Sequence, residues 1–315
     1  MMKKLTILAM AFGLMLGMAT PNQAHWELGT VWFVVQFPDG SVPSIDGNHN
    51  DWDGVPSSYN VTHDVMNDAR GLVPEGWSNA DWDGSDFSML HRIGWNDTEN
   101  MLYFATQAFD DEHNMDRSSH WSEDDSWEVS VTVDHDAIIS LEEGGYASVN
   151  DETIGINGRY NFAVPIHPTL GDWFWMRPGD LTGTEWLWPG TDWLGFAYDW
   201  DGNEFGESTY YYEMRVQPIA AYALGQEAGY QPDDLEIYDL EEGDLIHVSI
   251  VMIDNDGDFN NYRTPGCCGY WSTFDNCCSA VNDWVLAELD PAASFVSTAT
   301  AVEDDTWGHI KSRFK

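Results

Sequence analysis

The chain has 315 residues, with 54 acidic and 12 basic side chains and a formal charge of −42. This imbalance excludes nucleic acid as a partner, because proteins bind polyanions by releasing counterions with Lys and Arg, and it disfavours an anionic membrane surface for the same reason. Hydrophobic residues make up 43% of the chain and aromatic residues 14%, which is enough for a folded core.

Residues 1–24 predict a secretory signal peptide of the bacterial Sec type. Lys3 and Lys4 precede an apolar run from Leu5 to Met18, and Ala24 offers a small residue for cleavage. A membrane anchor is the alternative, but the run is shorter than the roughly 20 residues that span a bilayer. We therefore expect a secreted protein, extracellular or at the cell surface. Its acidic surface requires cations, from a saline habitat, from bound Ca²⁺ or from both.

Seven segments predict strands, because each is rich in β-branched or aromatic residues and is bounded by Gly, Pro, Asn or Asp. They are Val31–Phe37, Met101–Phe109, Ser126–Asp134, Tyr160–Ile166, Thr209–Pro218, Leu245–Ile253 and Trp284–Leu289. In the fifth segment Met214 and Val216 alternate with Glu213, so one face should pack while the other meets water or ligand. Since helices do not alternate with these strands, the fold class is all-β, an antiparallel, jelly-roll-like β-sandwich with long Trp-rich loops. Residues 171–207, which include Asp199, are expected to form a loop especially rich in Trp and Gly.

The sandwich domain is expected to span residues 25–295, because the sequence shows no fixed-period repeat and no interior linker. Residues 296–315 are expected to form a polar tether and a short amphipathic segment. Apolar side chains recur at helical spacing in 306–315, beside Lys311 and Lys315. Two interpretations explain this segment. It is either a frayed tail or a peptide that sorts the protein to, or docks it on, a cell-surface component.

All four cysteines lie in one predicted loop, as Cys267-Cys268 and Cys277-Cys278. An even number of cysteines in an exported protein predicts disulfides. Adjacent cysteines bridge each other only with strain, so two bonds across the loop are expected. A Cys₄ zinc site is the alternative, but the spacing lacks the C-x₂-C pairs that such sites use.

Two acidic clusters follow the pattern of calcium loops in outline. The candidate ligands are Asp254, Asn255, Asp256 and Asp258 in one cluster and Asp199, Asp201 and Asn203 in the other. Alternating carboxylate and amide oxygens around a Gly turn suit a hard cation that takes six to eight oxygen ligands. Neither cluster is followed by the Glu that completes an EF-hand, and ordinary Asp-Gly turns remain the alternative.

Seven short motifs occur in a defined order along the chain. They are Ile45-Asp46-Gly47, Asp51-Trp52, Trp95-Asn96-Asp97, Asp110-Asp111, Asp125-Ser126-Trp127-Glu128, Tyr212-Glu213-Met214 and Asp254 through Gly257. In this order they resemble the landmarks of family 9 carbohydrate-binding modules and the related DOMON-like sandwiches. The resemblance implies a β-sandwich that binds sugar, often with structural Ca²⁺, and usually without catalysis. The chain departs from the family in its length, its Trp-rich insert and its double-Cys loop.

The resemblance also implies where a polysaccharide or other glycan binds. Two aromatic rings clamp the terminal sugar in that family, and their positions correspond to Trp121 and Trp271 in this chain. Glu128 and Arg263 are candidate partners for the sugar hydroxyls. An indole ring suits this role because one side of a pyranose ring is apolar. Core packing is the alternative for any single Trp, since the chain has 17 of them.

The sequence therefore favours a secreted, non-catalytic carbohydrate-binding protein with structural calcium. A structural or cell-surface sandwich protein, sorted or docked by its C-terminal peptide, is the main alternative. A glycoside-active enzyme needs only two suitably spaced carboxylates, but no HExxH, GxSxG or P-loop motif occurs. Haem binding, known among DOMON relatives, lacks an identifiable Met or His ligand pair.

Overall fold

The computed structural model describes residues 31–62, 84–114, 125–133, 160–164, 166–167, 171–172, 175–177, 192–222, 235–255, 268–272, 282–293 and 295. Among these residues, two short 3-10 turns are the only helical elements, and the rest are strands and their connections. No helix in this part of the chain is long and apolar enough to cross a bilayer.

The first half of the chain contains β1 (Val31–Gln36), the turns η1 (His49–Trp52) and η2 (Ser57–Tyr59), β2 (Val61–Thr62), β3 (Phe87–Asn96), β4 (Met101–Asp110) and β5 (Ser126–Thr132). The middle contains β6 (Tyr160–Val164), β7 (Ile166–His167), β8 (Gly171–Asp172), β9 (Trp175–Arg177), β10 (Leu194–Gly202) and β11 (Ser208–Val216). The last part contains β12 (Ile219–Tyr222), β13 (Leu235–Ile237), β14 (Leu245–Asn255), β15 (Cys268–Ser272) and β16 (Asn282–Leu286). Each of the seven predicted strands corresponds to an observed one, although several ends differ; the observed strands are β1, β4, β5, β6, β11, β14 and β16. The long strands β3 and β10 were not predicted, and neither were the short strands β2, β7, β8, β9, β12, β13 and β15.

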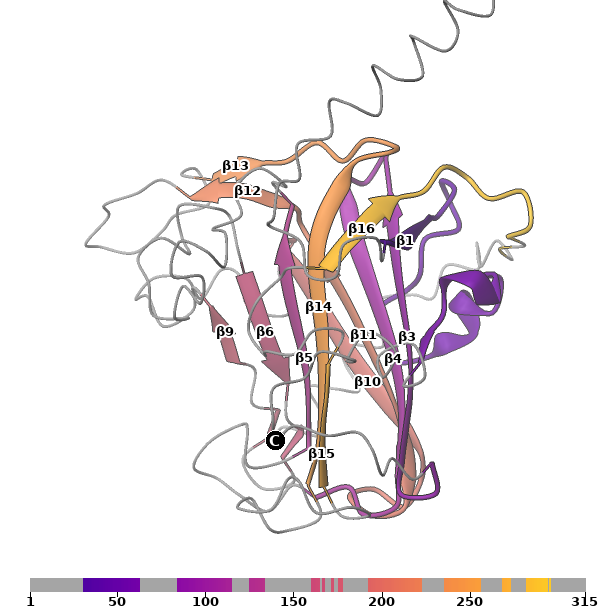
Figure 1. Ribbon diagram of the computed structural model, residues 1–315, viewed down its shortest axis with the longest axis vertical. Coiled ribbons are helices and arrows are strands. Elements are labelled where there is room, and N and C mark those ends of the chain that lie inside the picture. The colour runs from indigo at the N-terminus through magenta and orange to yellow at the C-terminus, as the bar shows by residue number, and fades with distance from the viewer. Residues whose placement is uncertain are drawn as a thin grey trace, which may run out of the picture.

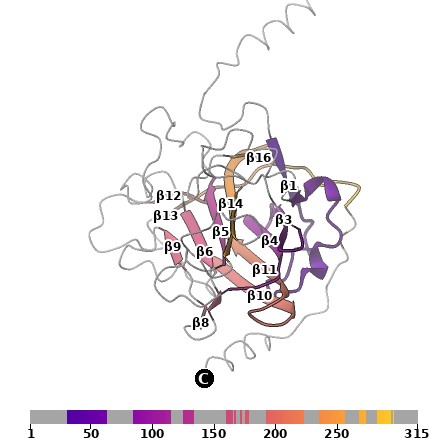
Figure 2. The ribbon, with the colours of Figure 1, turned by 60° about the horizontal axis from the view of Figure 1, so that its bottom comes forward.

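The principal sheet has twelve strands, in the order β10-β11-β4-β3-β1-β16-β14-β5-β6-β9, with β15 beside β14 and β2 beside β3. Its long strands run along the long axis of the molecule (Figure 1). Figure 2 shows that the sheet curls back on itself, from β9 through β14 and β16 to β1, then through β3 and β4 to β10. The two halves face each other, so the predicted β-sandwich is confirmed.

Strand β1 corrects the prediction of a wholly antiparallel sheet. Its first residues pair in parallel with β16, and Val35 and Gln36 pair in parallel with β3. Because β1 changes partner along its length, it joins the two halves of the sandwich. The other strand pairs among the described residues are antiparallel.

The main core lies between the two halves. Alternating residues of β3, β4, β10 and β11 meet alternating residues of β5, β14 and β16; examples are Leu102, Phe104, Phe196, Met214, Trp127, Ile250, Met252 and Trp284. The Trp127 ring lies 5.6 Å from the Tyr212 ring and 6.4 Å from the Phe196 ring. Burying each of these large apolar side chains contributes about 1.5–3 kcal/mol to folding.

A second apolar cluster covers the outer face of β4. It packs Phe37 against Trp52, Tyr103 and Phe295, with ring centroids 5.0, 5.7 and 5.0 Å away respectively. Gly94 lies beneath the Phe37 ring, where a Cβ would be 2.0 Å from a ring carbon. The segment that follows β1 thus folds over the sheet, and this part of the outer face is not open to water.

Candidate functional site

The buried carboxyl group of Glu213 joins three of the ordered motifs. It accepts hydrogen bonds from the backbone N–H of Asp46 at 3.0 Å, the backbone N–H of Gly47 at 2.7 Å and the indole N–H of Trp52 at 2.9 Å. Burial raises the pKa of Glu213 to about 8, although the three N–H donors act in the opposite direction. Glu213 was expected on the face that meets water or ligand; instead it is buried and anchors the N-terminal segment.

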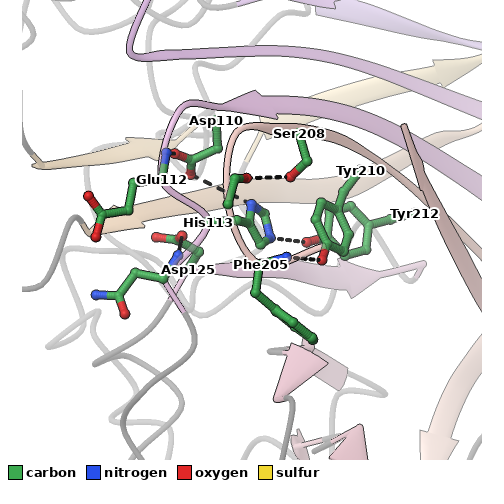
Figure 3. A network of polar contacts seen from close by, with 10 residues as sticks. Asp110, Glu112, His113, Asp125, Phe205, Ser208, Tyr210 and Tyr212 are labelled. Carbon is green, nitrogen blue, oxygen red and sulfur yellow. Dashed lines mark hydrogen bonds and ion pairs between the residues drawn. The ribbon is translucent and has the colours of Figure 1, made fainter. Parts of the chain in front are cut away.

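Two further motifs meet at the end of β4. Asp110 ends that strand, His113 lies in the turn after it, and Asp125 lies directly before β5 (Figure 3). All three side chains are buried, and one potential ligand atom from each lies within 4.8 Å of the others. The distance between His113 Nδ1 and Asp110 Oδ2 is 3.7 Å. A group of three or more His, Cys, Asp or Glu side chains this close together could hold a metal ion, and within the described residues these three form such a group.

The aromatic residues of β11 fix the His113 ring. The ring stacks on Tyr210 at 4.0 Å with an interplanar angle of 8°, and its Nε2 lies 3.2 Å from the Tyr212 hydroxyl. Burial lowers the pKa of His113 to about 3 and raises the pKa of Asp110 to about 7. At neutral pH the imidazole is therefore uncharged, and one ring nitrogen has a lone pair available for a cation.

A row of rings crosses the sandwich beside this cluster. It runs from Trp127 to Tyr212, Tyr210 and Trp200, with successive centroids 5.6, 5.9 and 6.1 Å apart. The side chains of Trp127, Tyr212 and Tyr210 are buried, whereas Trp200 on β10 is only partly buried. The row thus ends at the surface of the β10–β11 hairpin.

A pocket of about 360 Å³ opens on the outer face of the same half of the sandwich. It is lined by Val42, Pro43, Ser44, Ile45, Glu99, Tyr103, Asp192, Gly195, Phe196 and Arg215. Arg215 lies across Gly195, where a Cβ would be 3.0 Å from its Cγ. The Tyr103 hydroxyl donates to Glu99 at 2.6 Å. The pocket therefore combines apolar walls with one guanidinium and two carboxylate side chains, which suits a small polar ligand.

Neither a family model nor a curated protein matches the sequence. Among solved structures, a family 9 carbohydrate-binding module from Caldicellulosiruptor kristjanssonii in complex with cellotriose is similar, at 14% identity and a TM-score of 0.44, over 83% of this chain and 96% of that one. The structure of a family 9 module from the same organism with glucose is similar at 12% identity and a TM-score of 0.42, over 83% of this chain and 98% of that one. Both carry the name of the family that the ordered motifs resemble.

The four predicted sugar-binding residues are only partly within the described chain. Glu128 lies on β5 and is 1% exposed, so its side chain is buried rather than presented at the surface. The backbone of Trp271 lies in β15, opposite Met252 of β14. Trp121 and Arg263 lie outside the described residues. The binding role of all four residues stays a prediction.

The predicted calcium clusters have different surroundings. The segment from Asp199 is the end of β10 and a hairpin turn rather than the expected loop, and Asp199, Asp201 and Asn203 are exposed. Asp254 is buried near the end of β14, and Asn255 pairs with Cys268 of β15. The rest lie outside the described residues, namely Asp256, Asp258, Cys267, Cys277 and Cys278. Calcium binding and the disulfides stay predictions.

The sequence did not identify the cluster of Asp110, His113 and Asp125. Both aspartates were noted as family landmarks, but His113 was not connected with them. The available signal was a D-x-x-H spacing at the end of a predicted strand, followed by an aspartate directly before the next predicted strand.

Proposed function

We propose that this protein is a secreted, non-catalytic carbohydrate-binding protein that recognises a glycan through Trp side chains. The observation that carries the proposal is the meeting of the ordered motifs at Glu213. Gly47 and Glu213 are 166 positions apart and form a 2.7 Å hydrogen bond. Short motifs that match by chance in an Asp- and Trp-rich chain are not expected to contact one another in the folded structure, whereas these motifs do. This convergence supports the family resemblance, and sugar binding is what that resemblance implies.

The end of the sandwich near Asp125 is proposed as the glycan-binding surface. Trp121 precedes Asp125 by four residues, so their Cα atoms are at most about 14 Å apart. Trp271 pairs with Met252, which in turn pairs with Trp127, two residues after Asp125. The row of rings that begins at Trp127 ends in the partly buried Trp200. Flat rings of this kind suit the apolar face of a pyranose.

Structural calcium belongs to the same proposal. Asp254 is the second-last residue of the buried strand β14, and acidic side chains follow it in the sequence as Asp256 and Asp258. Carboxylate oxygens at this spacing suit Ca²⁺. The ion would stabilise the connection after β14, whereas the sugar would contact the Trp side chains.

The test is binding of the purified mature chain to insoluble polysaccharides, together with calorimetric titration. Cellotriose and glucose, the ligands of the family 9 structures, are the first probes. Trp121→Ala and Trp271→Ala should each weaken binding by about 10-fold or more, as is typical of a central aromatic contact, without lowering the melting temperature. Arg215→Ala, in the pocket on the outer face, is the matched control and should bind as the wild type does.

Each other outcome has a defined meaning. Loss of binding only in Arg215→Ala would transfer the site to the outer pocket. Binding to no polysaccharide would contradict the proposal, and release of reducing sugar would contradict its non-catalytic part. If deletion of residues 306–315 abolished retention at the cell surface, the structural alternative would gain support.

A further inference from the structure

We propose that Asp110, His113 and Asp125 form a binding site for a divalent first-row transition-metal ion, which takes Zn²⁺ in preference to Ca²⁺. The three residues each offer one ligand atom within 4.8 Å of the others. We assign these atoms as Asp110 Oδ2, His113 Nδ1 and one carboxylate oxygen of Asp125, because the first two are buried and lie 3.7 Å apart. None of the three residues belongs to the acidic segments expected to hold calcium, although Asp125, directly before β5, and Asp254, near the end of β14, lie at the same end of these two paired strands. The site also does not depend on sugar binding.

The first observation is a pair of buried polar atoms without hydrogen bonds. Asp110 Oδ2 and His113 Nδ1 form no hydrogen bond with any described residue, and each side chain is only 1% exposed. Folded proteins rarely leave such atoms without a partner, because burial removes their hydrogen bonds to water. Their separation of 3.7 Å is too long for a hydrogen bond between them. An ion between the two atoms satisfies both.

The distances fit a small cation. With metal–ligand bonds of 2.0–2.1 Å, the 3.7 Å separation corresponds to an angle of about 130° at the ion, within the range of a distorted tetrahedral site. The Asp125 carboxylate lies within 4.8 Å of both other ligand atoms, so a small inward movement brings it into the same coordination shell. A fourth position is left for water.

The other polar atoms of the three ligands are already held by the protein. His113 Nε2 lies 3.2 Å from the Tyr212 hydroxyl (Figure 3). Nε2 can therefore carry the proton, which leaves the Nδ1 lone pair for the proposed ion. Asp110 Oδ1 accepts from the backbone N–H of Glu112 at 3.0 Å. Asp125 Oδ2 accepts from the backbone N–H of Asn114 at 2.5 Å. Such outer contacts orient the ligands of metal sites and increase their affinity.

The donor set decides which ion is expected. Ca²⁺ and Mg²⁺ prefer oxygen ligands throughout, whereas imidazole nitrogen suits Zn²⁺ and its neighbours in the first transition row. The site also joins two parts of the fold, because Asp110 ends β4 in one half of the sandwich and Asp125 precedes β5 in the other. Bound metal should therefore raise the stability of the whole sandwich.

The experiment uses the purified full mature chain, first treated with a chelator and then dialysed. Titration with Zn²⁺ should give one tight site per chain and raise the melting temperature, whereas Ca²⁺ at the same concentration should not compete for that site. Asp110→Asn and His113→Gln should each weaken Zn²⁺ binding by about 10-fold or more. His91→Gln is the matched control, since His91 is also fully buried but its Nδ1 lies 2.7 Å from the Thr106 hydroxyl.

A second measurement does not require a folded variant. Co²⁺ added to the metal-free wild-type protein should give the intense visible bands of a four- or five-coordinate site, and Zn²⁺ should abolish them. Absence of a tight Zn²⁺ site in the wild type would overturn the proposal. So would Zn²⁺ affinity that is unchanged in folded Asp110→Asn and His113→Gln, or displacement of Co²⁺ by Ca²⁺ as readily as by Zn²⁺.

Discussion

Replacing Gly47 with Ala tests the contact between the N-terminal segment and the sheet. Gly47 has a φ of +82°, and a Cβ at this position would be 2.5 Å from the carbonyl carbon of Tyr198 and 2.7 Å from the backbone nitrogen of Asp199. Gly40 has a similar φ of +74°, but no described atom lies within 4 Å of its Cβ position. The two glycines therefore have similar positive φ angles but different packing.

The expected magnitudes follow from this difference. A side chain at positive φ costs about 1–2 kcal/mol, and Gly40→Ala should lose only that amount. In Gly47→Ala the turn must also move away from β10, which lengthens the hydrogen bonds of 2.7 and 3.0 Å that Gly47 and Asp46 donate to Glu213. Each buried hydrogen bond lost at Glu213 adds about 1–3 kcal/mol, so Gly47→Ala should lose about 3 kcal/mol or more.

Urea unfolding followed by Trp fluorescence measures both free energies of unfolding. A change in midpoint at constant slope reports stability without a change in the unfolded state. Equal losses in Gly40→Ala and Gly47→Ala would refute the reasoning, because the contact of Gly47 with β10 and Glu213 would then contribute nothing. A second pair of variants, Glu213→Gln and the double variant Glu213→Gln/Trp52→Phe, tests the same contact by changing its residue on strand β11.

Three further predictions concern stability. Gly94→Ala should destabilise the fold by about 1–3 kcal/mol through overpacking against Phe37, and Phe37→Leu in the same chain should recover part of that loss in urea unfolding. Burial lowers the pKa of His91 to about 3, so the unfolded chain binds a proton below pH 6.5 that the folded chain excludes. As the pH falls from 6.5 towards 4, the wild type should therefore lose about 1.4 kcal/mol per pH unit relative to His91→Gln, and parallel pH profiles of unfolding would contradict this. Chelation of Ca²⁺ should lower the melting temperature if the acidic segment after β14 holds that ion. An unchanged melting temperature would indicate that the acidic side chains are an adaptation to a saline habitat and do not bind structural calcium.

Alternation and composition predicted the strands with strong β-forming sequences, such as β4 and β14. Strand β3 was missed because His91 and Arg92 interrupt its apolar pattern, although His91 is buried inside the core. Strand β10 was assigned to a Trp-rich loop because Gly195 and Asp199 are typical of loops. Gly195 nevertheless pairs with Arg215 of β11, and the Arg215 side chain lies across it; both contacts depend on the neighbouring strand and not on local sequence.

Local sequence patterns do not predict which distant strands and side chains come together. The parallel pairing of β1 with β16 depends on two segments at opposite ends of the sandwich sequence. Glu213 is on the face opposite Met214, as the alternation predicts, but its burial depends on a turn 166 positions earlier. Likewise, His113 meets Asp110 through a local turn, whereas its orientation depends on Tyr212, 99 positions later.

The most direct test of carbohydrate binding is calorimetric titration of the purified mature chain with a panel of soluble oligosaccharides that includes cellotriose. Saturable binding of at least one member, lost in Trp121→Ala and in Trp271→Ala but retained in Arg215→Ala, is the predicted result. A folded protein that releases no heat with any oligosaccharide and binds no insoluble polysaccharide would contradict the proposed function.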